Sequence, residues 1–168
     1  MRTVWRITTA RFADTAFSGE GARLYGGRWN PKGFAMVYTA ESRALALLEL
    51  MVQDVPLRAR YVLIPAQLPD TLTVTHVGLA KLSADWRRLD RRDALQRIGR
   101  DWLEQRHSAV LAVPSAVVPA EHNYLLNPAH PDFADVLMGK PEALDTDLRL
   151  MRSLSAGDEP PAFPPGPD

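Results

Sequence analysis

Residues 25–33 read Tyr25-Gly26-Gly27-Arg28-Trp29-Asn30-Pro31-Lys32-Gly33, and a strand-like segment, residues 34–39, follows them. Proline in the second and glycine in the fourth position of residues 30–33 predict a tight turn, and the apolar and aromatic residues on both sides predict a β-hairpin. The two glycines before Arg28 remove side chains where another segment or a ligand comes close. A cation beside bare backbone and two tyrosines, Tyr25 and Tyr38, suits a pyrophosphate-containing nucleotide. The alternative is a hairpin with a surface arginine.

Length and composition indicate one globular domain. The 168 residues are enough to bury a substantial core, and the 46% hydrophobic and 24% charged residues are ordinary for a soluble protein. The 20 basic and 20 acidic residues give zero formal net charge, which argues against nonspecific nucleic-acid binding. Without cysteine there is neither a disulfide framework nor a thiol nucleophile.

The N-terminus lacks the apolar region of a signal peptide, and no apolar run approaches the roughly 20 residues of a membrane span. We therefore expect a cytoplasmic protein.

A helix is predicted from Glu41 to Gln53, a segment rich in alanine and leucine. At about 100° per residue, the centre of its apolar stripe is expected at Ala44, Leu47, Leu48 and Met51. Glu49 lies at the edge of this stripe. It is either a solvated surface residue or a partly desolvated carboxylate that stabilises developing positive charge.

The middle of the chain contains three predicted strands: residues 60–68, residues 71–77 and the nearly apolar residues 108–118, which we expect to be central. Pro114 predicts an edge, a bulge or a break in the last of these. Between them, residues 83–106 form an arginine-rich helical region whose interleaved acidic residues favour a solvated, salt-bridged face over a nucleic-acid surface.

The remaining segments carry weaker signals. Small polar residues predict an irregular loop at 11–23, and asparagines and prolines predict a polar loop over residues 123–132. Short strands are expected at 133–137 and 148–151, and a flexible proline-rich tail at 153–168.

Ser115 is not surrounded by the Gly-x-Ser-x-Gly elbow of a serine hydrolase. It is either a positioned hydroxyl beside a ligand or a polar residue at a strand kink.

The histidines share no metal-ligand spacing, so we expect no metal site; they are His76, His107, His122 and His130. Spacing and composition alone predict a single α+β domain with a candidate nucleotide site.

Several stretches together resemble the RES domain, a bacterial toxin family named for an arginine, a glutamate and a serine. The stretches fall in the family's order over roughly residues 3–151, and they are 5–7, 26–30 with Gly33, 37–42, 46–49, Gly99 with 102–103, 113–115, 123–128, and Asp147 with 149–150. Residues 99–102 depart slightly, since an acidic residue is expected to follow the glycine more directly.

This resemblance implies the fold of the ADP-ribosyltransferase toxins, which is α+β with a split, mixed β-sheet core and flanking helices. It assigns residues 1–152 to one NAD-binding domain. The implied reaction cleaves the bond between nicotinamide and its ribose through an oxocarbenium-like transition state and needs no metal.

The resemblance also assigns site residues. Arg28 is expected to bind the pyrophosphate, Tyr38 to stack on nicotinamide, Glu49 to stabilise the ribosyl cation, and Ser115 to hydrogen-bond nicotinamide or its ribose. Glu41 is a second candidate for the catalytic glutamate. The other residues expected to line the NAD site are Tyr25, Gly26, Gly27 and Asn127.

The implied function is that of a type II toxin that depletes NAD⁺ as a glycohydrolase or a phosphorylase. A mono-ADP-ribosyltransferase acting on a protein is the alternative, and a noncatalytic partner-binding module is a third. The implied partner is an antitoxin with a helix-turn-helix DNA-binding part that blocks the NAD site. The toxin itself would then contact neither nucleic acid nor membrane.

Overall fold

A computed structural model of the chain describes residues 1–53 and 59–145. Its centre is an eight-stranded sheet in the order β4-β5-β6-β2-β1-β3-β7, with β8 also paired to β3. The strands are β1 (Arg2–Thr9), β2 (Val37–Ala40), β3 (Tyr61–Leu68), β4 (Val74–His76), β5 (Val110–Pro114), β6 (His122–Leu126), β7 (Leu137–Met138) and β8 (Glu142–Ala143). The helices are α1 (Glu20–Tyr25), α2 (Arg43–Met51) and α3 (Arg92–Gln105), and the 3₁₀ segments are Ala10–Thr15, Leu79–Lys81, Leu89–Arg91 and Pro131–Asp135.

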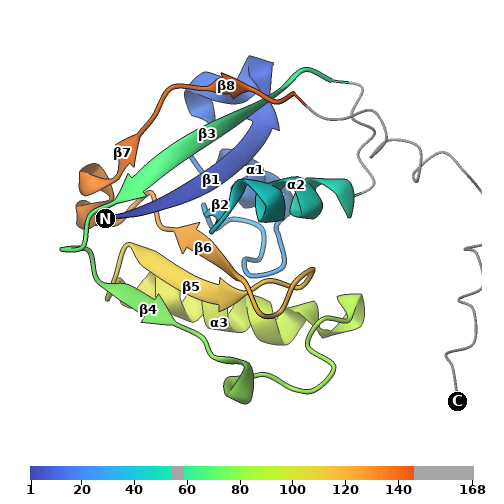
Figure 1. Cartoon of the computed structure of the whole chain (residues 1–168). Coiled ribbons are helices and arrows are strands. Elements are labelled where there is room, and N and C mark those ends of the chain that lie inside the picture. The colour runs from blue at the N-terminus through green and yellow to red at the C-terminus, as the bar shows by residue number, and fades with distance from the viewer. Residues whose placement is uncertain (54–58, 146–168) are drawn as a thin grey trace, which may run out of the picture.

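The sheet is mixed, because β4 and β5 are parallel whereas the other neighbours are antiparallel. It falls into two halves (Figure 1), one built from β1, β3, β7 and β8 and the other from β4, β5 and β6. Strand β2 joins them by pairing with β6 on one side and with β1, where Trp5 lies opposite Ala40, on the other. The predicted α+β class with a mixed sheet is confirmed.

Helices α2 and α3 cover the same face of the sheet. Leu45 and Ala46 of α2 pack with Trp5, Ala40 and Leu63. The residues of α3 that pack against Leu111, Val113 and Leu125 are Leu95, Trp102 and Leu103. Because directly paired residues and alternate residues of a strand share a face, these register positions place both helices on one side.

The opposite face carries a separate core. Val4, Val37, Ile64, Val110 and Leu126 pack there with Ala13, Phe17 and Phe133 from the segments that follow β1 and β6. Both faces of β5 are therefore covered, which explains why this strand is a continuous apolar run and is central, as expected.

The predicted hairpin around residues 30–33 is wrong. Strand β2 follows the turn as expected, but it pairs with β1 and β6 and not with the segment before the turn. That segment is the end of α1 and a loop, which Asn30 holds together by donating hydrogen bonds from Nδ2 to the carbonyls of Ala22, Pro31 and Phe34. The turn is therefore supported by the fully buried side-chain amide of Asn30 and not by a neighbouring strand.

Three loop and strand predictions also need correction. Residues 11–23 contain a 3₁₀ segment and the start of α1, and residues 122–126, expected in part as loop, form β6. The strand predicted at 133–137 is mostly the 3₁₀ segment Pro131–Asp135, with β7 after it. Strand β5 ends at Pro114, so the predicted break is confirmed. The strand expected at 148–151 and the tail at 153–168 lie outside the described residues.

The predicted helix at 41–53 is confirmed as α2, although it begins at Arg43, after Ser42 caps it by accepting a hydrogen bond from the amide of Leu45. Its buried residues are Leu45 and Ala46, whereas Leu48 is 40% exposed. The buried stripe is therefore rotated from the predicted one, and Glu49 is half-buried.

Helix α3 approaches the loop that bears Arg28 very closely at Gly99, where a β-carbon would collide with the carbonyl group of Trp29. We predict that Gly99→Ala lowers the free energy of unfolding by about 1–3 kcal/mol through overpacking. The matched control is Gly21→Ala in α1, where an added β-carbon meets nothing within 4 Å. Gly21→Ala should be neutral or stabilising by up to about 1 kcal/mol. Chemical denaturation measures both, and equal effects would contradict this packing account.

Candidate active site

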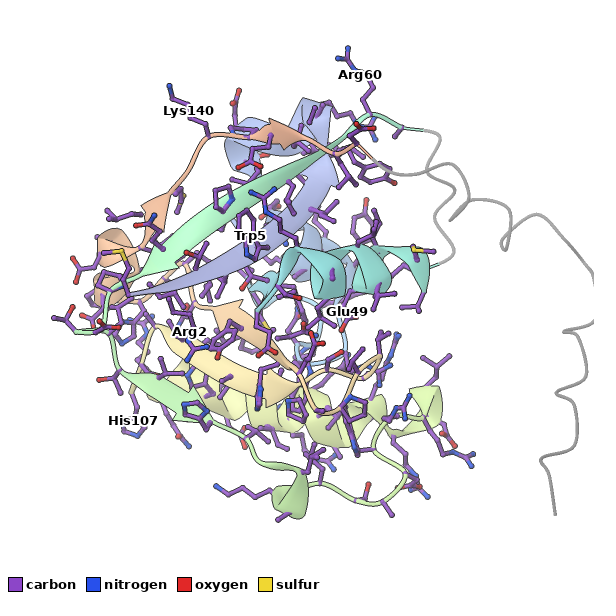
Figure 2. All side chains as sticks on the ribbon, in the orientation of Figure 1. Arg2, Trp5, Glu49, Arg60, His107 and Lys140 are labelled. Carbon is purple, nitrogen blue, oxygen red and sulfur yellow. The ribbon has the colours of Figure 1, made fainter. Side chains whose placement is uncertain are left out.

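The carboxylate of Glu49 connects α2 to the other half of the sheet. Its Oε1 atom accepts a hydrogen bond of 2.7 Å from the hydroxyl of Ser115 and another of 2.7 Å from Nδ2 of Asn123. Ser115 follows β5, and Asn123 of β6 lies opposite Val113 of β5. Figure 2 shows Glu49 on the side of α2 that faces these strands. Two donors on one oxygen hold the half-buried carboxylate in a single orientation.

Ser115 is fully buried, and its hydroxyl oxygen is already committed within the protein. It donates to Glu49 and accepts from the backbone amides of Val117 and Val118 at 3.0 and 3.1 Å. A hydroxyl has one donor and two acceptor positions. In this structure Ser115 therefore orients Glu49, whereas a direct bond to a ligand was expected.

Tyr38 projects from β2 onto the face that α2 and α3 cover. Its hydroxyl donates to Oδ1 of Asn30 at 2.7 Å and accepts from the backbone amide of Trp29 at 3.0 Å. Burial raises the pKa of Tyr38 well above its ordinary value, so the phenol stays neutral. The ring is thereby fixed beside the loop that carries Arg28.

Gly27 is a glycine because Tyr38 occupies its side-chain space. An added β-carbon would lie 2.5 Å from the hydroxyl of Tyr38 and 2.8 Å from Oδ1 of Asn30. The close approach predicted for this glycine is real, and the group that approaches is a side chain of the protein. Gly27 is also held from the other side, since Gln96 of α3 donates a hydrogen bond to its carbonyl.

Arg28 lies among charges of both signs. Its Nη1 donates to the carbonyl of Arg87 at 3.0 Å. Burial lowers the pKa of Arg28, and the positive charges of Arg92 and Arg87 lower it further, while the negative charge of Glu49 acts in the opposite direction. The guanidinium and the Glu49 carboxylate are thus close enough to influence each other, and Arg87 and Arg92 add positive charge on the side of α3.

The remaining predicted residues are placed differently. Gly26 ends α1 with φ of 73°, and Tyr25, the last residue of that helix, is 78% exposed. Asn127 is buried four residues beyond Asn123, about 13 Å along the strand direction, where its Oδ1 accepts from the amide of Ala129. Glu41 faces His122 at 3.5 Å and not the Ser115–Asn123 pair. Of the predicted residues, the structure joins Glu49 to Ser115 by a hydrogen bond and packs Tyr38 against the loop of Arg28, whose pKa responds to the charge of Glu49.

Sequence reasoning missed other polar residues of the site. Asn123 is expected in a loop, whereas it belongs to β6, whose apolar residues 124–126 fit the buried part of a strand. Arg6 of β1 was singled out only as part of a matching stretch, yet its Nη1 donates to the carbonyl of Tyr38 at 2.9 Å, and burial lowers its pKa to about 10. Its Nε is buried without a hydrogen-bond partner among the described residues.

Two absences are noted for residues 1–53 and 59–145, the part of the chain that the structure describes. These residues contain no group of three or more His, Cys, Asp or Glu residues placed to hold a metal ion. They also contain no helix with the length and apolar character needed to span a membrane. Separately from these absences, a guanidinium, an oriented carboxylate and a neutral tyrosine suit a ligand with an anionic part and a developing cation.

Comparison with solved structures identifies the fold. The chain resembles a chain of the Mycobacterium tuberculosis MbcT–MbcA toxin–antitoxin complex with a TM-score of 0.74 over 91% of this chain and 88% of that one, at 24% identity. At this identity the likeness establishes the fold.

Sequence comparison identifies the family. The model of the RES domain matches residues 3–147. A protein named Toxin Res from Photorhabdus laumondii is 38% identical over 132 residues, 77% of this chain and 84% of the relative. The Prs ADP-ribosylating toxin of a Sphingobium species is 39% identical over 156 residues, 88% of this chain and 96% of the relative. The chain belongs to the RES domain family, as its sequence motifs indicated.

The two hydrogen bonds of Tyr38 should make a measurable contribution to stability. We predict that Tyr38→Phe lowers the free energy of unfolding by about 1–3 kcal/mol, because the buried Trp29 amide and Asn30 Oδ1 lose a partner. Tyr25→Phe, at an exposed position, should change it by less than about 0.5 kcal/mol. Paired denaturation curves measure the difference, and equal values for the two variants would show that the Tyr38 hydroxyl does not support the loop.

Proposed function

We propose that this RES-domain protein is the toxin of a toxin–antitoxin pair and that it cleaves the nicotinamide–ribose bond of NAD⁺. The observation that carries the proposal is the Glu49 carboxylate, which two donors hold in one orientation within the electrostatic reach of Arg28. The names of two relatives, Toxin Res and Prs ADP-ribosylating toxin, support the assignment to this class of activity.

The proposed reaction uses charge stabilisation and not a protein nucleophile. The bond between the ribose C1′ and the nicotinamide nitrogen breaks, and its electron pair neutralises the pyridinium, so that nicotinamide leaves uncharged. The ribose carries the positive charge in the transition state, where the Glu49 carboxylate stabilises it. An acceptor oxygen then bonds to C1′ and releases its proton if it carries one.

The other site residues bind the pyrophosphate and the nicotinamide of the dinucleotide in this proposal. Arg28 presents a planar fork of donors to the pyrophosphate, and the positive charges of Arg87 and Arg92 favour the same anion. The neutral ring of Tyr38 supports the nicotinamide. Ser115 contributes by orienting Glu49.

The acceptor distinguishes the variants of this function. Water makes the enzyme an NAD glycohydrolase, inorganic phosphate makes it a phosphorylase, and a protein side chain makes it an ADP-ribosyltransferase. We place depletion of NAD⁺ first. Protein modification is the second candidate, because the relative from Sphingobium, at 39% identity, is named an ADP-ribosylating toxin.

The proposed partner is a cognate antitoxin that blocks the site and carries a helix-turn-helix DNA-binding part. The fold neighbour is a chain from a toxin–antitoxin complex, which supports a partner of this class. DNA binding would then belong to the antitoxin, in keeping with the zero formal net charge of this chain.

Incubation of the purified protein with NAD⁺, with and without phosphate and with cell lysate, tests the reaction and its acceptor. Mass spectrometry should find free nicotinamide together with ADP-ribose, with a phosphorylated ADP-ribose, or with an ADP-ribosylated lysate protein. NAD⁺ that stays intact at stoichiometric protein in every arm would refute the enzymatic proposal and leave a noncatalytic binding module.

Variants of the two charged residues test the site. We predict that Glu49→Gln lowers kcat for nicotinamide release by about 100-fold or more, because the transition state loses its counter-charge. Arg28→Ala should mainly raise KM for NAD⁺. Glu41→Gln and the exposed Glu104→Gln on α3 are the matched controls and should keep wild-type kinetics. Loss of turnover in Glu41→Gln with retention in Glu49→Gln would reverse the assignment of the two glutamates.

A further inference from the structure

Asn123 is a polar residue of the site whose part in the proposed reaction has not been assigned. It lies in β6 opposite Val113 and Ala40, on the face that α2 and α3 cover. Its Nδ2 donates a hydrogen bond of 2.7 Å to Oε1 of Glu49. A carboxylate only accepts hydrogen bonds when it is charged, so the nitrogen of this amide must face Glu49 and the oxygen must face away.

Both donors of Glu49 converge on the same oxygen. Ser115 and Asn123 bond Oε1, and no side chain of the described residues donates a hydrogen bond to Oε2. Because the hydroxyl of Ser115 is itself held by two backbone amides, its position is set by the chain and not by a ligand. The arrangement divides the carboxylate into one anchored oxygen and one that is available to a substrate.

The second polar atom of Asn123 provides an independent observation. Its Oδ1 is buried and has no hydrogen-bond partner among the residues that the structure describes. Buried acceptors are nearly always paired, and an exception calls for an explanation, such as a catalytic role or a partner from outside the chain. This carbonyl belongs to the same amide that fixes Glu49, so it lies next to the carboxylate.

We propose that Asn123 is a positioning residue with two functions. Its N–H fixes Glu49 with Oε2 turned to the substrate, and its carbonyl accepts a hydrogen bond from an N–H or O–H donor of that substrate. The second function rests on the proposed function, since in NAD⁺ the donor is a ribose hydroxyl or the nicotinamide carboxamide. The first function depends only on the contacts within the protein.

Steady-state kinetics of nicotinamide release test both functions. Asn123→Ala should lower kcat by about 10- to 100-fold, because Glu49 is no longer held in the productive geometry, and should also raise KM. Asn123→Asp keeps the size and should lower kcat further, because a second carboxylate repels Glu49. The control pair is Gln67→Ala and Gln67→Glu, at an exposed amide of β3, which should both match the wild type.

The donor on the substrate is identified with the nicotinic acid analogue of NAD⁺, which lacks the carboxamide N–H. If the carboxamide is the donor, the effect of Asn123→Ala on KM disappears with this analogue, and if a ribose hydroxyl is the donor, the effect persists. A KM that Asn123→Ala leaves unchanged with both dinucleotides would overturn the substrate contact. An unchanged kcat would overturn the positioning of Glu49.

A readout without turnover separates this proposal from the proposed function. In an amide-resolved ¹H–¹⁵N spectrum, the side-chain NH₂ signals of Asn123 are assigned by their loss in Asn123→Ala. They should move to the range of solvent-exposed side-chain amides in Glu49→Ala. If the wild type releases no nicotinamide, the proposed function fails, and this shift still decides whether Asn123 holds Glu49. Signals that do not respond to Glu49→Ala would overturn the inference.

Discussion

The structure depends on the carboxylate of Glu49, which is carried by a helix on one half of the sheet and held by residues of the other half. Glu49 belongs to α2, which packs on β1 and β3, yet its hydrogen bonds go to Ser115 and Asn123 in the half built around β5 and β6. A charged group removed from water is stable only when such bonds replace its hydration. The fold meets this requirement and in doing so fixes the orientation of the group around which the proposed chemistry is built.

The loop that carries Arg28 is fixed by comparable means. Asn30 donates hydrogen bonds to three backbone carbonyls, and the hydroxyl of Tyr38 accepts one from the Trp29 amide. Gln96 of α3 donates a further hydrogen bond to the carbonyl of Gly27. Such a loop holds its cation in place before a ligand arrives, so binding requires little ordering of the backbone. Preorganisation of this kind is what charge stabilisation in an active site requires.

Much of the site could be predicted from the sequence, although mainly through resemblance to a family. Helical periodicity placed Glu49 at a boundary, and the motifs assigned Ser115 and Tyr38, but no local pattern shows that Ser115 and Glu49 touch, since they are 66 residues apart. Strand β6 was missed in part because its polar residues resemble a loop, and its pairing with β2 and β5 is decided by long-range contacts. The prediction of a hairpin was wrong for the same reason, because β2 pairs with β1 and β6, which are distant in the sequence from the turn.

The packing of Tyr38 against Gly27 has a consequence for any redesign of this protein. The hydroxyl of the ring stands where a side chain at position 27 would begin, so the two positions form one steric unit. A larger residue at position 27 requires a smaller residue at position 38. A smaller residue at position 38 loses the aromatic surface of the tyrosine. Libraries intended to change ligand preference would therefore have to randomise both positions jointly, and scanning either one alone would return mostly unstable proteins.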